Sequence, residues 1–364
     1  MKILQLIQKP QPRGAEVFTA QLSSNLENLQ HSSHILALFD SPDSSRFISK
    51  CQLLNANSKA RFWDKDGWAK LATIIKELKP DVIQANAGDT LKYAVFSKLF
   101  FKWKQPIVFR NASTLSSYIK NPLQKLYNEF LYKQTDAIAS VSEYSRNDLL
   151  LLYPGLKSRT YTIPIGLEEK IRVENPFPVN HKDQVKLVHV GGFSFEKNHT
   201  RLLHIFSALL ATQEHVHLWL VGDGPLRMSI ENQVKDMGLQ NNVHFTGFVN
   251  NPLDYIANAQ VLVLPSIIEG LPGVILEAML YETPVVAYNV GGIREIVKSN
   301  ETGWLIEPGD EKGFAKALED IILMKEADKY KIIQKAEKLV KGEYMNVHIA
   351  TKFAFLYKQL LNKN

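Results

Sequence analysis

The sequence of 364 residues contains one cysteine, Cys51, which excludes an internal disulfide and a cysteine-rich metal site. No apolar run approaches the roughly 18 residues that a membrane-spanning helix requires. The first apolar run, in MKILQLIQKPQPRG, is too short and too soon broken for a signal peptide. We expect no Asp-x-Asp metal-binding pair, and the ten histidines suggest no metal site. These absences predict a cytoplasmic protein in a reducing compartment.

The content of apolar residues excludes a disordered chain. Hydrophobic residues make up 45% of the sequence and aromatic residues 10%, which is enough for well-packed cores. Because 364 residues exceed one ordinary hydrophobic core, two domains of similar size are expected.

Short β-rich apolar runs alternate with helical patterns along the chain, which is typical of parallel sheets with crossover helices. The predicted strands lie at 2–7, 34–39, 81–86, 106–111, 136–142 and 160–166, and then at 185–192, 215–224, 242–247, 259–266, 283–292 and 302–310. The polar segment 168–183 between the two series is interpreted as a linker. The sequence thus predicts an α/β protein of two doubly wound domains, with ligands bound beyond the carboxyl ends of the strands in a cleft between them.

A basic and aromatic stretch stands out in the first half. Eight basic residues from Lys92 to Lys133 accompany a single acid, Glu129, and five aromatic residues lie between Tyr93 and Trp103. Such a mixture suits a helix on an anionic membrane surface. An amphipathic core helix with a solvated basic edge is the simpler alternative. No nucleic-acid-binding motif accompanies the charge, so nucleic acid is not expected as a partner.

Two glycine turns follow predicted strands in the second half. VGGFSFEKNH ends a strand with Gly191 and Gly192 and brings Lys197 to the start of a helix, and VGDGP follows the next strand. Glycines let backbone N–H groups approach an anion, and Lys197 adds positive charge. Neither turn has the third glycine of a dinucleotide fingerprint or the pattern of a Walker loop. Taken alone, each is better explained as a tight turn at the end of a sheet.

The segment EGLPGVILE places Glu269 and Glu277 on either side of a helix start. Pro272 has the backbone angle that suits a first helical turn, so the N–H groups around it can meet a diphosphate. Glu269 would then face a hydroxyl-rich group beside the phosphates, and Glu277 could accept hydrogen bonds from a cis-diol such as ribose. Together they predict a nucleotide-sugar site. The alternative is that Glu269 caps the helix and Glu277 is merely solvated.

In this company the chain resembles the retaining glycosyltransferases of GT-B fold, family four, the glycogen-synthase-like group 1 enzymes. The resemblance runs nearly end to end, through PRGAEVFTAQLS, SVSEYSRNDL, TIPIGLE, VGGFSFEKN, LVGDGPLR, VHFTGFV, LVLPSIIEGLPGVILEAM, TPVVAYNVGGIREIV and NETGWLIEPGD. It implies two Rossmann-like domains that face each other across a cleft. The acceptor domain would span 1–167, the linker 168–183 and the nucleotide-sugar domain 184–343, with a helix at 344–364 that crosses back to the first domain.

The resemblance also implies roles for individual residues. Lys197 and Glu269 would be catalytic, since Lys197 stabilises the departing diphosphate and Glu269 orients the donor sugar. The donor-binding residues would be Arg13, Gly14, Gly191, Gly192, Phe248, Val249, Gly270, Leu271, Pro272, Gly273, Val274 and Glu277, with Phe248 and Val249 beside the nucleobase and Glu277 on the ribose. No cofactor and no metal ion are implied.

The chain departs from the family pattern at several positions. Gly192 stands where the family usually has an arginine, and Arg13 is the first candidate for a replacement cation. The junction PIGLE lacks the usual asparagine, and the histidines often found after the third and fourth strands are absent. The acceptor pocket would then be shaped by Asn86, Asp89, Arg110, Asn111 and Ser113.

The function implied is the retaining transfer of a hexose-type sugar from a nucleotide-diphosphate sugar to a saccharide or lipid-linked acceptor. Cell-surface polysaccharide or glycolipid synthesis is the expected setting, with the basic stretch as a peripheral contact at the inner face of the membrane. One alternative is a catalytically weak or dead nucleotide-sugar-binding protein, which the glycine at 192 motivates. Another is a different GT-B enzyme, such as a nucleotide-sugar epimerase or a phosphorylase. Nothing in the sequence indicates an oligomeric state.

Overall fold

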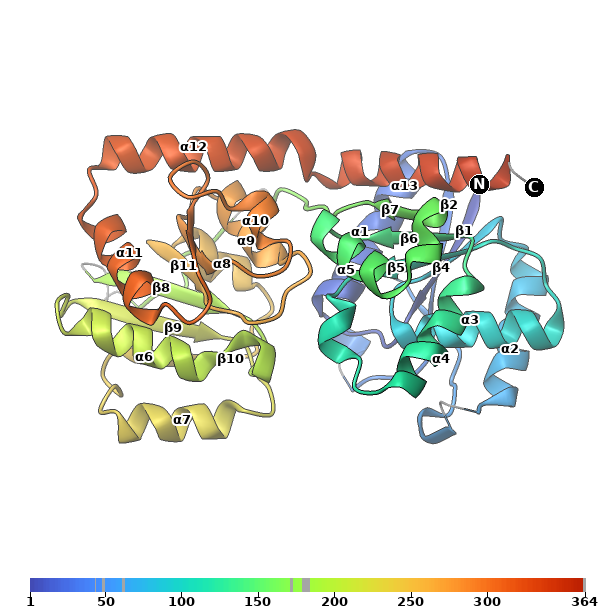
Figure 1. Ribbon diagram of the computed structural model, residues 1–364, viewed down its shortest axis with the longest axis horizontal. Helices are drawn as coiled ribbons and strands as arrows, with labels where there is room; N and C mark the ends of the chain where they lie inside the picture. The colour runs from blue at the N-terminus through green and yellow to red at the C-terminus, as the bar shows by residue number, and fades with distance from the viewer. Residues whose placement is uncertain (43, 48–49, 61–62, 171–172, 179–183, 363–364) are drawn as a thin grey trace. The chain divides into compact units, whose positions relative to one another are not determined.

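The computed structural model describes residues 1–42, 44–47, 50–60, 63–170, 173–178 and 184–362 (Figure 1). The chain divides into two compact units, the first made of Met1–Glu168 and Tyr344–Asn364 and the second of Glu169–Glu343. Of the predicted linker at 168–183, residues 171–172 and 179–183 lie outside the described residues.

The first unit is built on a parallel sheet of seven strands in the order β3-β2-β1-β4-β5-β6-β7. The strands are β1 (Lys2–Ile7), β2 (Ser32–Ala37), β3 (Gln52–Leu53), β4 (Val82–Ala85), β5 (Ile107–Asn111), β6 (Ala137–Ser140) and β7 (Thr160–Thr162). All six strands predicted for this half are confirmed. The sequence analysis missed β3, which has two residues and lies at the sheet edge.

Helices cover both faces of this sheet. One face packs against α1 (Gly14–Asn28) and α13 (Asn346–Leu361), through Phe18 and Phe353 among others. The other face packs against α2 (Lys65–Leu78), α3 (Gly88–Phe101), α4 (Pro122–Lys133) and α5 (Glu143–Leu152). Short 3-10 turns lie at Ser44–Arg46, Ser58–Ala60, Leu115–Tyr118 and Pro154–Arg159.

Polar side chains begin several of these helices. Asp64 accepts a hydrogen bond from the N–H of Gly67 at the start of α2, and Asn121 and Ser142 cap α4 and α5 in the same way. Each cap satisfies an N–H group that has no partner inside its helix. At the other end of the chain, reciprocal backbone hydrogen bonds join Leu167 to the segment that leads into α13.

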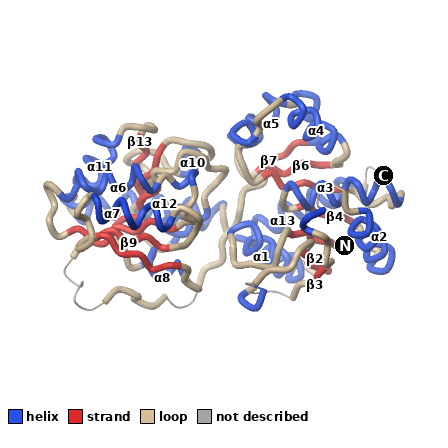
Figure 2. The backbone as a smooth tube through the Cα atoms, turned by 90° about the horizontal axis from the view of Figure 1, so that it is seen from below, coloured by secondary structure: helices blue, strands red, loops and turns tan. Residues whose placement is uncertain are grey.

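The second unit is built on a parallel sheet of six strands in the order β10-β9-β8-β11-β12-β13. The strands are β8 (Val185–Val190), β9 (Val216–Val221), β10 (Val243–Gly247), β11 (Val261–Leu264), β12 (Val285–Tyr288) and β13 (Trp304–Ile306). All six were predicted. In both units the strands form an inner layer between helices (Figure 2).

The helices of the second unit also lie in two layers. On one face α6 (His199–Leu210), α7 (Arg227–Asp236) and α11 (Glu311–Leu323) share a core with the strands. The remaining helices are α8 (Pro252–Ala257), α9 (Gly273–Leu280), α10 (Ile293–Ile296) and α12 (Glu326–Glu343), and a 3-10 turn lies at Phe195–Lys197. Among these, α9 packs against both α8 and α12.

The strand order reverses once in each sheet, between β1 and β4 in the first unit and between β8 and β11 in the second. This is the doubly wound arrangement that the sequence predicts, and ligands of such sheets bind beyond the carboxyl ends of the strands at the reversal. The loops after β8 and β11 carry Lys197 and Glu269. No helix in the described part of the chain is long and apolar enough to cross a membrane.

Candidate functional site

Lys197 and Glu269 come together at the point where the strand order of the second unit reverses. Lys197 Nζ donates a hydrogen bond to Glu269 Oε1 over 2.6 Å. The side chains are 21% and 11% exposed, so the ion pair is largely shielded from water. The two residues stand 72 positions apart, and the meeting of the loops after β8 and β11 joins them.

The helix α9 begins directly after this loop and presents its N-terminus there. Pro272 is its N-cap residue, with extended backbone angles and no side-chain cap. Within the described residues, no hydrogen bond is made by the N–H groups of Gly273 and Val274. Uncapped N–H groups at a helix start, with a lysine beside them, suit a diphosphate. This local structure is compatible with the predicted anion-binding turn, which stays a prediction.

Glu277 lies on α9 beyond this first turn, in an otherwise apolar helix. Burial raises the pKa of its carboxyl, and the charge of Lys170 opposes this effect. Lys170 Nζ donates its hydrogen bond to Asn251 instead. Across the described residues, the Glu277 carboxylate has neither a hydrogen bond nor an ion pair. An acid in such surroundings is costly unless something pairs with it, so Glu277 is the group of this site that most needs a ligand.

Two glycines that were not predicted as site residues allow neighbouring backbone to pack closely against the loops that carry Glu269 and Gly191. Gly291 has φ +56°, and a Cβ there would lie 2.0 Å from the carbonyl oxygen of Glu269. Gly222 has φ +135°, and a Cβ there would lie 2.1 Å from the carbonyl oxygen of Gly191. Any larger residue would push both loops out of place. The signal for these positions was available, because each lies in a glycine turn directly after a strand.

Two buried histidines lie close to the loop that carries Lys197, which we call the lysine loop. His189 Nδ1 contacts the carbonyl oxygen of Val263 over 2.9 Å, and the ring of His199 stacks on Phe193 with centroids 4.2 Å apart. Burial, together with the positive charge of Lys197, lowers the pKa of His199 to about 4, and burial lowers that of His189 as well. Both imidazoles are therefore neutral near pH 7, and Lys197 carries the positive charge of this loop.

Gly192 stands in open space. A Cβ added there would meet only the carbonyl oxygen of Asp223, at 3.7 Å. A longer side chain is therefore sterically possible at the position where the family usually has an arginine. Phe248 and Val249, predicted to lie beside the nucleobase, follow β10, where Phe248 is exposed and Val249 is partly exposed. A cation that the sequence analysis did not single out, Arg227, lies close to Gly247 and pairs with Asp223 and Glu231.

The predicted acceptor residues gather at the carboxyl ends of β4 and β5 in the first unit. Asn86 is buried and donates hydrogen bonds to Gln5 Oε1 and to the carbonyl oxygen of Leu6. Asn111 is buried as well and bonds inward, to Ser140 and Ser145. The amide nitrogens of both residues are committed to internal hydrogen bonds, whereas Asn111 Oδ1 is buried and has no hydrogen-bond partner among the described residues.

Asp89 and Ser113 lie nearer to the surface of the same edge, and both are partly exposed. Asp89 accepts hydrogen bonds from Gln8 over 2.6 Å and from Lys92 over 3.0 Å. Arg13 and Gly14 stand exposed at the start of α1 in the first unit. Their predicted contact with the donor, and Arg13 as a replacement cation, stay predictions.

Arg110 lies buried at the end of β5, with its guanidinium 4.3 Å from the centre of the Phe18 ring. Burial lowers its pKa to about 10, against the opposing effect of the Glu16 charge. Its Nε and Nη1 have no hydrogen-bond partner in the described residues. Glu16 is buried in the first turn of α1, and burial raises its pKa. The sequence analysis missed Glu16, whose acidic side chain inside a helix start gave no distinct signal.

No cluster of three or more potential metal ligands occurs in the described ranges. The first half does contain one Asp-x-Asp pair, Asp64 and Asp66, which the sequence analysis passed over. The Asp64 carboxylate is engaged in internal hydrogen bonds, because it accepts hydrogen bonds from the N–H groups of Gly67 and Asn57 and from the Tyr93 hydroxyl. Asp64 therefore stabilises the start of α2.

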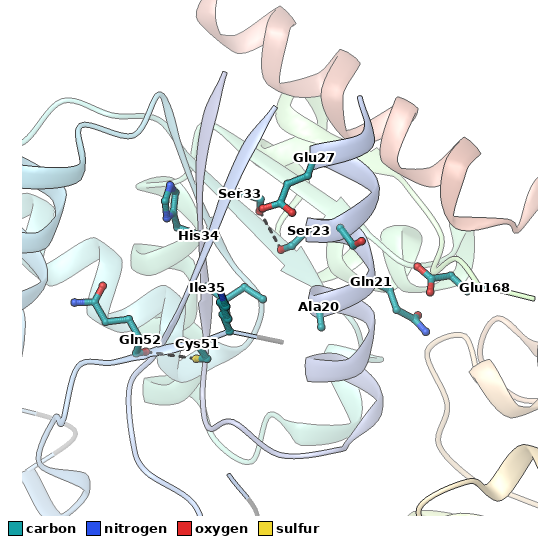
Figure 3. A pocket seen from close by; sticks show the side chains of 12 residues that line it. Ala20, Gln21, Ser23, Glu27, Ser33, His34, Ile35, Cys51, Gln52 and Glu168 are labelled. Atoms are coloured by element: carbon teal, nitrogen blue, oxygen red, sulfur yellow. Dashed lines mark hydrogen bonds between the residues drawn. The ribbon is translucent and has the colours of Figure 1, made fainter. Parts of the chain in front are cut away.

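A hollow of about 800 Å³ lies elsewhere in the first unit, between α1 and the strands β2 and β3 (Figure 3). Its lining includes Ser23, Glu27, Ser33, His34 and Cys51, and a hydrogen bond joins the Ser33 and Ser23 hydroxyls across 2.9 Å. None of the residues predicted for donor, acceptor or catalysis lines it. The hollow is thus distinct from the candidate site.

Comparison with known proteins supports the reading of these motifs. Residues 171–339 match the family model for glycosyl transferases group 1, and residues 12–170 match that for glycosyltransferase family 4. The N-acetyl-alpha-D-glucosaminyl L-malate synthase of Bacillus anthracis is 26% identical over 64% of this chain and 62% of its own length. An uncharacterized glycosyltransferase of Methanocaldococcus jannaschii is 24% identical, and the match spans 60% of its length.

A longer match is to a Campylobacter jejuni enzyme that transfers N-acetylgalactosamine to a glycan on diphospho-undecaprenol. It is 26% identical over 80% of this chain and 78% of its own length. The fold is similar to that of Anabaena HepE in complex with UDP-glucose, with a TM-score of 0.84, 21% identity and coverage of 99% of this chain and 100% of that one. Through the two family models, which together cover most of its length, the chain belongs to the group 1 glycosyltransferases of GT-B fold.

Proposed function

We propose that this protein transfers a hexose-type sugar from a nucleotide-diphosphate sugar to a hydroxyl group, with retention of the anomeric configuration. The observation that carries the proposal is the Lys197–Glu269 pair at the uncapped start of α9, with the unpaired Glu277 carboxylate on the same helix. A cation, free N–H groups and an unpaired acid match a leaving diphosphate and a ribose in the order in which a nucleotide sugar presents them.

Each group has one task in this proposal. Glu277 accepts hydrogen bonds from the ribose hydroxyls, and the first turn of α9 binds the diphosphate. Lys197 moves from Glu269 to the diphosphate when the donor binds, which leaves Glu269 to orient the sugar. The acceptor hydroxyl attacks on the face from which the phosphate departs, and a phosphate oxygen takes its proton. Such a step needs no protein base, which agrees with two buried, neutral histidines beside the lysine loop.

We further propose that Lys197 and the α9 N-terminus stabilise the leaving group without a metal ion. For the acceptor we propose a saccharide or a lipid-linked saccharide in cell-surface polysaccharide or glycolipid synthesis. The Campylobacter relative, which acts on a glycan carried by diphospho-undecaprenol, supports this class. A lipid-linked acceptor would require the enzyme to work at the membrane surface.

The second candidate function is a nucleotide-sugar-binding protein with weak or no activity. It is favoured by Gly192, because the family's usual arginine would add a positive charge beside Lys197. Both candidates bind the donor, so only turnover separates them.

The proposed function is tested first by thermal unfolding with a panel of nucleotide sugars, since a ligand that binds the folded state raises the melting temperature. The best donor is then incubated with and without EDTA, and release of the nucleoside diphosphate is followed. We expect turnover that EDTA leaves intact and, by NMR, a product with the donor's anomeric configuration. Binding without turnover would support the second candidate. Loss of activity that manganese or magnesium restores would contradict the metal-independent step.

Replacement of Glu277 by alanine should weaken nucleotide binding. A lost charged acceptor is worth roughly 1.5–3 kcal/mol, or about a 10- to 150-fold rise in Kd. Because burial raises the pKa of Glu277, binding of the nucleotide sugar by the natural protein should also weaken as the pH falls through that raised value. Glu277→Gln should abolish this pH dependence. Calorimetry checks both, and an unchanged affinity of Glu277→Ala would refute the ribose assignment.

Replacement of Lys197 by alanine should lower kcat far more than it raises KM. The charge on the diphosphate grows as it departs, so the lysine contributes most in the transition state. Loss of one such preorganised group costs about 2.7–4 kcal/mol, or roughly a hundred- to a thousandfold in rate. Steady-state kinetics beside Lys312→Ala, an exposed lysine of the same unit, provide the control. A rise in KM at unchanged kcat would make Lys197 a binding residue only.

Gly192→Arg should raise kcat, by roughly tenfold or more if a second preorganised cation approaches its usual worth. The position has room for the side chain, because a Cβ there meets only a carbonyl oxygen at 3.7 Å. Gly192→Met has similar reach without charge and should leave kcat unchanged or lower. Equal kcat and KM values of the two variants would mean that the site does not need a second cation.

A further inference from the structure

The helix α4 carries an apolar stripe on its solvent side. Leu123, Leu126 and Phe130 are 78%, 65% and 41% exposed. Their spacing, three and then four residues, places them on one face of the helix. The inward face of α4 is supplied by other residues, the buried Leu131 and Tyr132. The outward stripe is therefore additional to the stripe that packs on the core.

This stripe continues onto the neighbouring helices. The Phe130 ring lies 6.2 Å from that of Phe96 on α3, which stacks on Trp68 of α2. Trp68 also stacks on Phe100, whose ring lies 6.1 Å from that of Trp63. Phe100 and Trp63 are themselves 48% and 61% exposed. We name the exposed members, Leu123, Leu126, Phe130, Phe100 and Trp63, the α4 patch.

Exposed basic residues occur on the segments that carry the α4 patch, where the exposed Asp66 also lies beside Lys65. From residue 98 to residue 133 the chain has seven basic residues and one acid, Glu129, and Glu129 is paired with Lys133 over 2.7 Å. The exposed lysines of this region are Lys65, Lys102, Lys104, Lys120, Lys125 and Lys133. Exposed leucines and aromatic rings on segments rich in exposed lysines suit the boundary of an anionic bilayer, where apolar groups enter among the headgroups and lysines remain at the lipid phosphates.

The structure relocates the contact that the sequence suggested. Lys92 is buried and paired with Asp89, and Tyr93 is fully buried. The first half of α3 is therefore a core helix, as the simpler alternative had it. The exposed surface begins at the end of α3, where Phe100 and Phe101 are 48% and 46% exposed, and continues on α4. This helix starts beyond the carboxyl end of β5, so Leu123 lies toward the edge of the sheet that holds Asp89 and Ser113.

We propose that the α4 patch docks this protein onto an anionic lipid bilayer. Leu123, Leu126 and Phe130 enter the headgroup region, and lysines of the same segments contact lipid phosphates. Docking there brings the carboxyl edge of the first sheet close to the bilayer, where a lipid-linked hydroxyl would be presented. This use of the surface rests on the proposed function, but the docking itself does not depend on catalysis.

Vesicle sedimentation tests the proposal. The natural protein should bind vesicles of phosphatidylcholine with phosphatidylglycerol, and more weakly as salt is added. Leu123→Gln/Leu126→Gln should lower the apparent association constant at least tenfold. Lys120→Glu/Lys125→Glu should lower it by about fivefold or more per charge. Two matched controls in the second unit, the exposed Leu323→Gln and the exposed pair Lys335→Glu/Lys338→Glu, should bind as the natural protein does.

Several outcomes would overturn the proposal. Equal binding to vesicles of phosphatidylcholine alone would show that the lysines do not contribute to binding. Unchanged binding by both patch variants, or no binding by the natural protein, would show that the α4 patch is not a docking surface. A self-association that light scattering detects, and that Leu123→Gln/Leu126→Gln abolishes, would assign the surface to a second copy of the chain. Donor-induced thermal shifts should be equal in all variants, so loss of donor binding would count against the proposed function and not against docking.

Discussion

The candidate site depends on one ion pair, that of Lys197 with Glu269. Two parallel strands that are neighbours in the sheet and far apart in sequence end side by side, and the pair joins the loops that follow them. Shielding from water makes such a pair stronger than a surface ion pair, but it also leaves each charge dependent on its partner. A donor that takes the lysine onto its phosphates must therefore satisfy the carboxylate as well, which sugar hydroxyls can do. In the proposed function the pair would thus couple recognition of the diphosphate to recognition of the sugar.

Such coupling requires a rigid backbone in the two loops that carry the pair. Gly291 and Gly222 allow two segments to approach the Glu269 and Gly191 carbonyls more closely than any side chain would permit. A further hydrogen bond runs from the N–H of Gly292 to the carbonyl oxygen of Gly270 over 2.9 Å. The loops are thus held by neighbouring backbone, which fixes the positions of the Lys197 and Glu269 side chains for the proposed ligand.

Most of the architecture could be predicted because buried parallel strands are short, continuous apolar runs, which a sequence displays directly. Only β3 was missed, since two residues make no pattern. At the site, Glu269, Glu277 and Lys197 were identifiable because their residue types are unusual beside apolar strands. Glu16 was not identifiable, and the internal hydrogen bonds of Asn86, which was expected to shape the acceptor pocket, were not predictable either, because both depend on contacts between elements, such as that of Asn86 with Gln5. The Asp64–Asp66 pair shows the converse, since a motif suggestive of metal binding is used to cap a helix.

The exposed stripe on α4 could not be predicted for a related physical reason. The spacing of Leu123, Leu126 and Phe130 is that of a helix that faces a core, and a sequence alone does not say which of two apolar stripes faces inward. In the structure Leu131 and Tyr132 take the inward positions, which leaves the longer stripe in water at a cost in hydration free energy. Scattered apolar side chains on a surface need no explanation, but an exposed apolar stripe along a helix of a lysine-rich segment does. A surface that is costly in water and lies on a lysine-rich segment becomes favourable against an anionic bilayer, so the same residues that weaken the isolated fold would strengthen the docked one.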